Sequence, residues 1–107
     1  MKRLFNSSVL TVGVLVALGS TQSGCIVGGV YAYKANSAAS ALEHAKVLGA
    51  DRLAEFEYHF ANENLKKAME EAAEASYGDA IVFADLALEF AEKAIVGAKA
   101  AHEGGGR

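Results

Sequence analysis

Proline is absent from this chain of 107 residues, and cysteine occurs only once. Without proline, no helix that the pattern suggests contains a built-in break. The single cysteine excludes an internal disulfide. The sequence has no glycine-rich loop between a strand and a helix, so nucleotide binding has no support, and it lacks the ligand spacings of zinc sites. At this length the chain holds at most one domain.

Basic charge is also scarce. Removal of a leader containing Lys2 and Arg3 would leave eight basic against thirteen acidic residues, a net charge of about −5 before the termini. A nucleic-acid-binding protein needs a basic surface, so nucleic acid is not the expected partner. Alanine dominates after residue 35 and has the highest helix propensity, which favours an all-helical domain.

Residues 1–24 have the parts of a bacterial secretory signal peptide: a basic start, a ten-residue apolar run over residues 9–18, and small residues after it. The four residues that end at Cys25, Gln-Ser-Gly-Cys, resemble the lipobox of bacterial lipoproteins. That resemblance implies cleavage between Gly24 and Cys25 and a lipid anchor, with fatty acids such as palmitate, on Cys25. More than one acyl chain is what stable membrane anchoring requires.

Gln22 departs from the lipobox, in which an aliphatic residue usually stands at this position. Two alternatives therefore stay open. One is an uncleaved anchor from Val9 to Tyr33, which is long enough to cross a bilayer. The other is an ordinary secretory signal with an incidental cysteine. Ile26, rather than aspartate, follows Cys25, and by the sorting rule of the proteins that this segment resembles, it favours the outer membrane, facing the periplasm.

After a linker over residues 25–35, the pattern predicts an all-α domain over residues 36–103. Asn36 and Ser37 are the expected cap of a first helix, and Gly49 is its expected end. Residues 104–107 are the expected flexible tail.

Two further helices are expected within this domain. Asp51 caps the first of them, which runs to about Ser76. The turn is expected at residues 77–79, with Gly78 in the left-handed conformation and Asp79 capping the last helix, which runs to about Ala101.

Alanine recurs at alternating four- and three-residue steps in both long helices, which is heptad spacing. The two series are Ala54, Tyr58, Ala61, Leu65, Ala68, Ala72 and Ala75, and Ala80, Ala84, Ala87, Ala91, Ala94, Ala98 and Ala101. A short link makes the two helices antiparallel neighbours. The predicted fold is an antiparallel helical hairpin with an alanine-rich seam, which a shorter N-terminal helix completes as a small three-helix bundle.

Larger apolar residues flank this seam and widen the apolar arc of the last helix to roughly 220°, about twice an ordinary amphipathic stripe. An apolar surface that neighbouring helices leave uncovered usually marks a contact site. The predicted partner-binding residues are Ile81, Phe83, Leu86, Leu88 and Phe90. The alternative is that they are plain intramolecular core. A second stripe that needs cover consists of Leu53, Phe56 and Phe60.

Residues 37–100 resemble an alanine-rich family of bacterial envelope lipoproteins, the domain of unknown function 4398 family. The likeness rests on Gly49-Ala50, on AEFEYHFANENLKKAMEEA over residues 54–72 and on YGDAIVFADLALEFAEKAI over residues 77–95. Family members typically have a Tyr-Ala-Pro-like start to the long helix, where this chain has Leu53-Ala54-Glu55. The resemblance implies a periplasm-facing lipoprotein, in a family of which some members are linked to peptidoglycan-binding outer-membrane proteins. It implies no enzymatic activity.

No catalytic residue, cofactor or metal site is expected. Glu55, His59 and Glu63 share a helix face at four-residue steps, but that face lies opposite the seam and has the composition of a solvated surface. The expected function is that of a structural or adaptor lipoprotein that binds other envelope proteins by helix packing. The alternatives are a self-associating periplasmic spacer, a helical accessory protein on an uncleaved transmembrane anchor, and a carrier for a small apolar ligand, which the close-packing alanine seam disfavours.

Overall fold

The computed structural model describes the backbone of residues 2–105 and the side chains of residues 25–105. This part of the chain is all-α, as the sequence predicts, and contains no strand. Its elements are α1 (Lys2–Val47), α2 (Ala50–Leu53), α3 (Glu55–Ala73) and α4 (Tyr77–Gly105).

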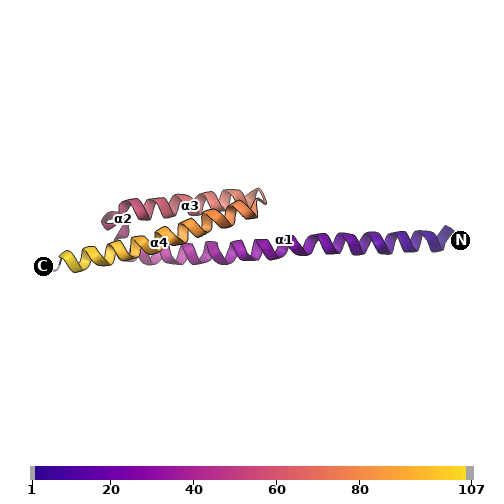
Figure 1. Ribbon diagram of the computed structural model, residues 1–107, viewed down its shortest axis with the longest axis horizontal. Coiled ribbons are helices and arrows are strands. Elements are labelled where there is room, and N and C mark those ends of the chain that lie inside the picture. The colour runs from indigo at the N-terminus through magenta and orange to yellow at the C-terminus, as the bar shows by residue number, and fades with distance from the viewer. Residues whose placement is uncertain (1, 106–107) are drawn as a thin grey trace.

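The helices pack lengthwise into a rod of 89 × 17 × 15 Å (Figure 1). α3 and α4 lie antiparallel, and α1 lies beside α4 in the same direction, where it also contacts α3. The N-terminal part of α1 continues alone beyond the α3–α4 turn. The expectation of a shorter N-terminal helix is therefore wrong, because α1, with 46 residues, is the longest element.

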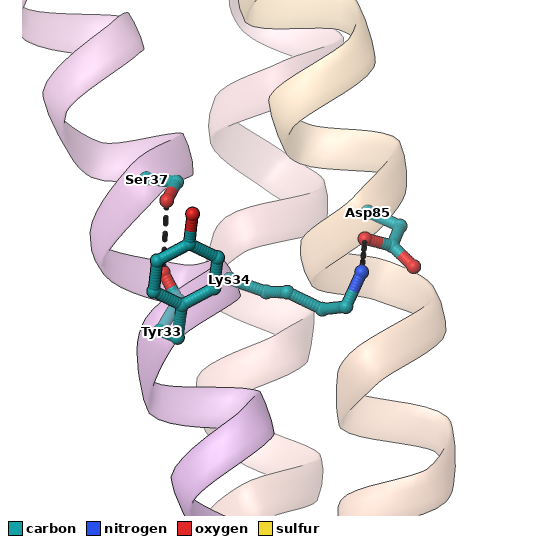
Figure 2. A network of polar contacts seen from close by, with 4 residues as sticks. All are labelled: Tyr33, Lys34, Ser37 and Asp85. Carbon is teal, nitrogen blue, oxygen red and sulfur yellow. Dashed lines mark hydrogen bonds and ion pairs between the residues drawn. The ribbon is translucent and has the colours of Figure 1, made fainter.

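The first helix does not begin at Asn36 and Ser37, as their capping chemistry predicts. Both residues lie inside α1, and the expected linker over residues 25–35 is helical. The Ser37 hydroxyl donates a 3.0 Å hydrogen bond to the Tyr33 carbonyl one turn earlier (Figure 2). A serine can satisfy its hydroxyl in this way within a helix, so a good capping residue does not have to start one.

Gly49 ends α1 as expected. It has φ +79°, in the left-handed region where glycine is favoured. Asp51, however, is not the cap of the next helix, because it lies within the first turn of α2. The single helix expected over residues 51–76 is instead divided at Ala54, whose φ of −141° and ψ of 58° separate α2 from α3.

The turn between α3 and α4 lies three residues earlier than expected, at residues 74–76 rather than 77–79. Ala75 takes the left-handed conformation, with φ +61°. The Ser76 amide donates to the Glu71 carbonyl at 2.8 Å, and the Ala75 amide donates to the Ala72 carbonyl at 3.0 Å. These two bonds make a Schellman motif, with alanine at the position that glycine usually occupies. Gly78 and Asp79 are ordinary residues in the first turn of α4.

The predicted alanine seam forms the centre of the bundle over most of its length, but Ala75 is exposed in the turn, and Tyr58, Leu65, Ala72 and Ala101 are only half-buried. Six alanines of α4 have no exposed area: Ala80, Ala84, Ala87, Ala91, Ala94 and Ala98. In α3, Ala61 and Ala68 are equally buried, and α1 contributes Ala38, Leu42 and Ala45. Twelve of the thirteen buried apolar residues among the described side chains are alanines. Because alanine is small, the helix backbones approach closely.

Among the described side chains, an ion pair and a hydrogen bond join α1 and the residue after its end to α4. The Lys34 ammonium contacts the Asp85 carboxylate across the two helices (Figure 2). Near the other end of the bundle, His102 Nε2 lies 2.7 Å from the Leu48 carbonyl oxygen. Both contacts are consistent with the parallel direction of α1 and α4, because the later residue of one segment meets the later residue of the other.

The expected flexible tail over residues 104–107 is not seen in its first two residues. Gly104 and Gly105 continue α4, whereas Gly106 and Arg107 lie outside the described residues.

Candidate functional site

The predicted lipid-attachment residue, Cys25, is exposed on α1, and its thiol is free. It lies one helical turn before Gly28, where a Cβ would be 3.6 Å from the Tyr77 ring of α4. Cys25 is therefore close to the point where α1 leaves the bundle, beside the α3–α4 turn (Figure 1). The side chains of the predicted signal peptide, Gly24 included, lie outside the described residues, so cleavage after Gly24 stays a prediction.

The candidate membrane-spanning segment, from Val9 to Tyr33, falls partly among the described side chains, from Cys25 onward. Within the part of the chain whose side chains are described, no helix is both long and apolar enough to cross a bilayer. The apolar run over residues 9–18 lies outside that part.

All five predicted partner-binding residues are half-buried on α4, and helical spacing places them on two flanks of the seam. Ile81 and Leu88 lie at seven-residue steps before Ile95, which packs against the buried cluster that contains Ala45 of α1. Seven residues are two helical turns, so this stripe faces the α1 side. The five residues therefore do not form one continuous patch.

The second flank consists of Phe83, Leu86 and Phe90, which share a face at three- and four-residue steps. The Phe90 ring packs against Phe60 of α3, with ring centroids 4.4 Å apart, and lies edge-on to Phe56 at 6.2 Å. Phe56 and Phe60 stack at 5.6 Å. Three rings from two helices thus form one aromatic cluster on the outside of the hairpin.

This aromatic cluster (Phe56, Phe60 and Phe90) is open to solvent on one side. Phe56 is 67% exposed. A shallow, open depression beside it is lined by Glu55, Phe56, His59, Phe60 and Glu63. The Lys93 ammonium lies 4.4 Å from the centre of the Phe90 ring, in cation–π contact. Such a surface suits an apolar partner side chain with a polar or charged neighbour.

Phe56 does not belong to the predicted partner-binding set, although its stripe with Leu53 and Phe60 is visible in the sequence. A second group that the prediction missed lies on α1 next to Cys25. Ile26, Val30 and Tyr33 are 69%, 42% and 74% exposed. Their spacing of four and three residues was the available signal, but the linker assigned to residues 25–35 concealed it.

The remaining polar groups form solvated helix faces. Lys67 lies 2.9 Å from the Glu71 carboxylate, and Lys93 lies 2.7 Å from that of Glu89, both at four-residue spacing. The hydrogen bond from Lys67 to Glu71, together with the charge of that carboxylate, raises the pKa of the lysine above its ordinary value of 10.5. Among the described residues, no three acidic, histidine or cysteine side chains gather in a geometry that could hold a metal ion.

Comparison with known proteins adds no further identification, since no family model, curated protein or solved structure matches the chain.

Proposed function

We propose that this protein is a lipid-anchored adaptor of the bacterial cell envelope, which binds other envelope proteins through the apolar outer surface of its helices. The observation that carries the proposal is the division of apolar side chains by size. The described side chains include no large one that is fully buried, whereas ten large apolar residues are exposed. A bundle that keeps alanine inside and larger apolar groups outside has contact surface to offer.

The α3–α4 hairpin is the unit that presents this surface. The buried alanines of its two helices hold them close together, and the aromatic cluster joins their outer faces. An aromatic cluster of this kind is a common anchor of protein interfaces, because rings supply a large contact area with few rotatable bonds. Ile81 and Leu88, on the flank toward α1, serve as supporting core in this proposal.

The proposed location in the cell envelope follows from Cys25. The resemblance of residues 22–25 to a lipobox supports acylation, and the exposure of the cysteine on α1 supports access to it. Ile26 supports sorting to the outer membrane. By the resemblance of residues 37–100 to envelope lipoproteins of the domain of unknown function 4398 family, the partners include peptidoglycan-binding outer-membrane proteins.

One observation favours a second candidate. α1 runs without a break through the predicted cleavage site, so the leader is helically continuous with the bundle. This continuity suits an accessory protein on an uncleaved membrane anchor. The intact mass of the protein isolated from membranes separates the two candidates: the adaptor lipoprotein lacks residues 1–24 and carries acyl chains, whereas the anchored form retains the leader.

The binding surface is tested by site-specific crosslinking in cells. A photoreactive side chain replaces Phe56 in one variant and Val96 in a matched control, because both residues are 67% exposed but Val96 lies outside the aromatic cluster. We expect a discrete adduct with a different protein from position 56 and little from position 96. Equal yields from both positions would refute the surface assignment, and an adduct with a second copy alone would make the protein a self-associating spacer.

The anchor is tested by Cys25→Ser and metabolic labelling with radioactive fatty acid. We expect the wild type to take up label and the variant to take up none. Incorporation into the variant would show that the lipid is attached elsewhere.

A further inference from the structure

The outward side of α1 differs in chemistry from the rest of the surface. Residues at alternating four- and three-residue steps share this side and form the outer α1 stripe: Ile26, Val30, Tyr33, Ser37, Ser40, His44 and Val47. It contains no acidic residue, no lysine and no arginine. Ile26, Tyr33 and Val47 are 69%, 74% and 85% exposed, so large apolar side chains lie at both ends of the stripe.

Nearly all acidic residues lie outside α1. Twelve of the thirteen follow residue 50, and Glu43 is the exception. Asp85, Glu89 and Glu92 are exposed on α4, and Glu55, Glu63 and Glu70 are exposed on α3. Anionic lipid headgroups disfavour a surface rich in carboxylates at close range. Of the three long faces, the side of α1 that carries the stripe has the fewest carboxylates, because the exposed Glu43 is the one acidic residue beside it and the exposed Lys46 lies three residues further along the helix.

The stripe is also continuous with the lipid attachment point. Cys25 directly precedes Ile26 in the same helix, and no irregular segment separates the cysteine from the bundle. Acyl chains on Cys25 therefore hold the first turn of the stripe at the bilayer. A span of 22 residues from Cys25 to Val47 is about 33 Å of helix, so a rigid α1 has only a few orientations relative to the surface.

We propose that the outer α1 stripe lies along the bilayer that holds the lipid on Cys25, with Ile26, Val30 and Tyr33 inserted at the interface and α3 and α4 turned away from it. This inference rests on the proposed lipid anchor. Apolar side chains on one face of a helix insert to the level of the headgroups and upper acyl chains, where tyrosine is also favoured. The aromatic cluster on the outside of the hairpin then remains open to a protein partner.

The sequence contains no tryptophan, so a single introduced indole reports on one position. Three variants of the acylated protein are placed in vesicles of phosphatidylethanolamine and phosphatidylglycerol that contain a brominated quencher lipid. Tyr33→Trp and Val47→Trp lie at the two ends of the stripe. Val82→Trp, at a position that is 57% exposed on α4, is the control, because the contact between Lys34 and Asp85 brings this part of α4 near Tyr33 while Val82 lies outside the stripe.

We expect a blue shift and loss of emission from positions 33 and 47, and neither from position 82. Quenching at 33 and 82 but not at 47 would show that the end of the bundle with the α3–α4 turn faces the bilayer, and it would overturn the proposal. Quenching at none of the three would overturn it as well. A blue shift that depends on protein concentration without vesicles would make the stripe a contact between copies.

The same samples separate this inference from the proposed function. Mass spectrometry of each variant shows whether Cys25 carries acyl chains. If it carries none, the anchor and the stripe proposal both fail. If it is acylated and position 33 is not quenched, the anchor stands and the stripe proposal alone fails. Equal helical circular dichroism of the variants confirms that these exposed substitutions leave the fold intact.

Discussion

The conformation of the α3–α4 turn predicts that a glycine at position 75 and an alanine at position 78 each stabilise the protein. Ala75 holds a φ of +61°, while Gly78 lies in the first turn of α4. The left-handed conformation costs an alanine about 1–2 kcal/mol. Glycine avoids that cost but loses about 0.4–1 kcal/mol through its greater freedom in the unfolded chain. We therefore expect Ala75→Gly to raise the free energy of unfolding by about 0.5–1 kcal/mol.

Gly78→Ala tests the same turn with the opposite exchange. A Cβ at Gly78 would meet nothing within 4 Å, and the residue is helical. Alanine is favoured at such a position, so we expect a gain of about 0.5 kcal/mol. If the turn lay at residues 77–79 with Gly78 left-handed, the same substitution would instead destabilise the protein by about 1–2 kcal/mol. The sign of the change therefore decides where the chain turns.

Thermal unfolding followed by circular dichroism measures both effects, because about 1 kcal/mol shifts the Tm of a domain of this size by roughly 4–8 °C. The matched control is Ala73→Gly. Ala73 is exposed like Ala75 but ends α3 in ordinary helical conformation, so glycine there should lower the Tm. The position of the turn at residues 74–76 is refuted if Ala75→Gly is no more stable than Ala73→Gly, or if Gly78→Ala melts at a lower temperature than the wild type.

Three further changes test the core and the charged contacts. Ala87→Leu overpacks a seam position with no exposed area and should cost roughly 1–3 kcal/mol, so an unchanged Tm would contradict the close helix packing. Lys34→Met removes the ion pair with Asp85, in which the lysine side chain is 32% exposed and the aspartate side chain 49% exposed. The variant should have a free energy of unfolding lower by about 0.5 kcal/mol, and high salt should abolish the difference. Lys67→Gln should be slightly less stable than the wild type at neutral pH. The raised pKa of Lys67 beside Glu71 means that this contribution is complete below the ordinary value of 10.5 and is lost as the pH rises through the raised pKa, so urea titrations of the two proteins should converge in strongly alkaline solution.

The helical class and the seam were predictable because both depend on periodicity alone. Residues such as Ala84, Ala91 and Ala98 recur at a spacing that only a helix brings to one face, and each is fully buried. The boundaries were less predictable, because several residues can satisfy the same local chemistry. Ser37 bonds to a carbonyl within α1 instead of capping it, and Ala75 occupies a position that glycine usually holds.

The break at Ala54 depends on packing between distant segments. A Cβ on Gly97 of α4 would lie 3.0 Å from the Ala54 Cβ, so the glycine allows α4 to approach the chain where it bends. No local pattern around residue 54 reveals that contact. The candidate site shows the same limit: Phe90 was identified from its own helix, but its stacking with Phe56 and Phe60 requires knowledge of the register between α3 and α4.

The alanine interior of this bundle is related to the large apolar side chains that remain on its surface. Each buried alanine removes little more than a methyl group from water, worth about 0.8 kcal/mol, whereas full burial of a valine, leucine or phenylalanine contributes about 1.5–3 kcal/mol. The larger contributions are thus left to Phe56, Tyr33 and Val47, which remain exposed in the isolated chain. A partner or a bilayer that covers these side chains binds the folded state alone and raises its stability by mass action. If the proposed membrane contact and the proposed partner exist, each should therefore raise the stability of the folded bundle above its value in solution.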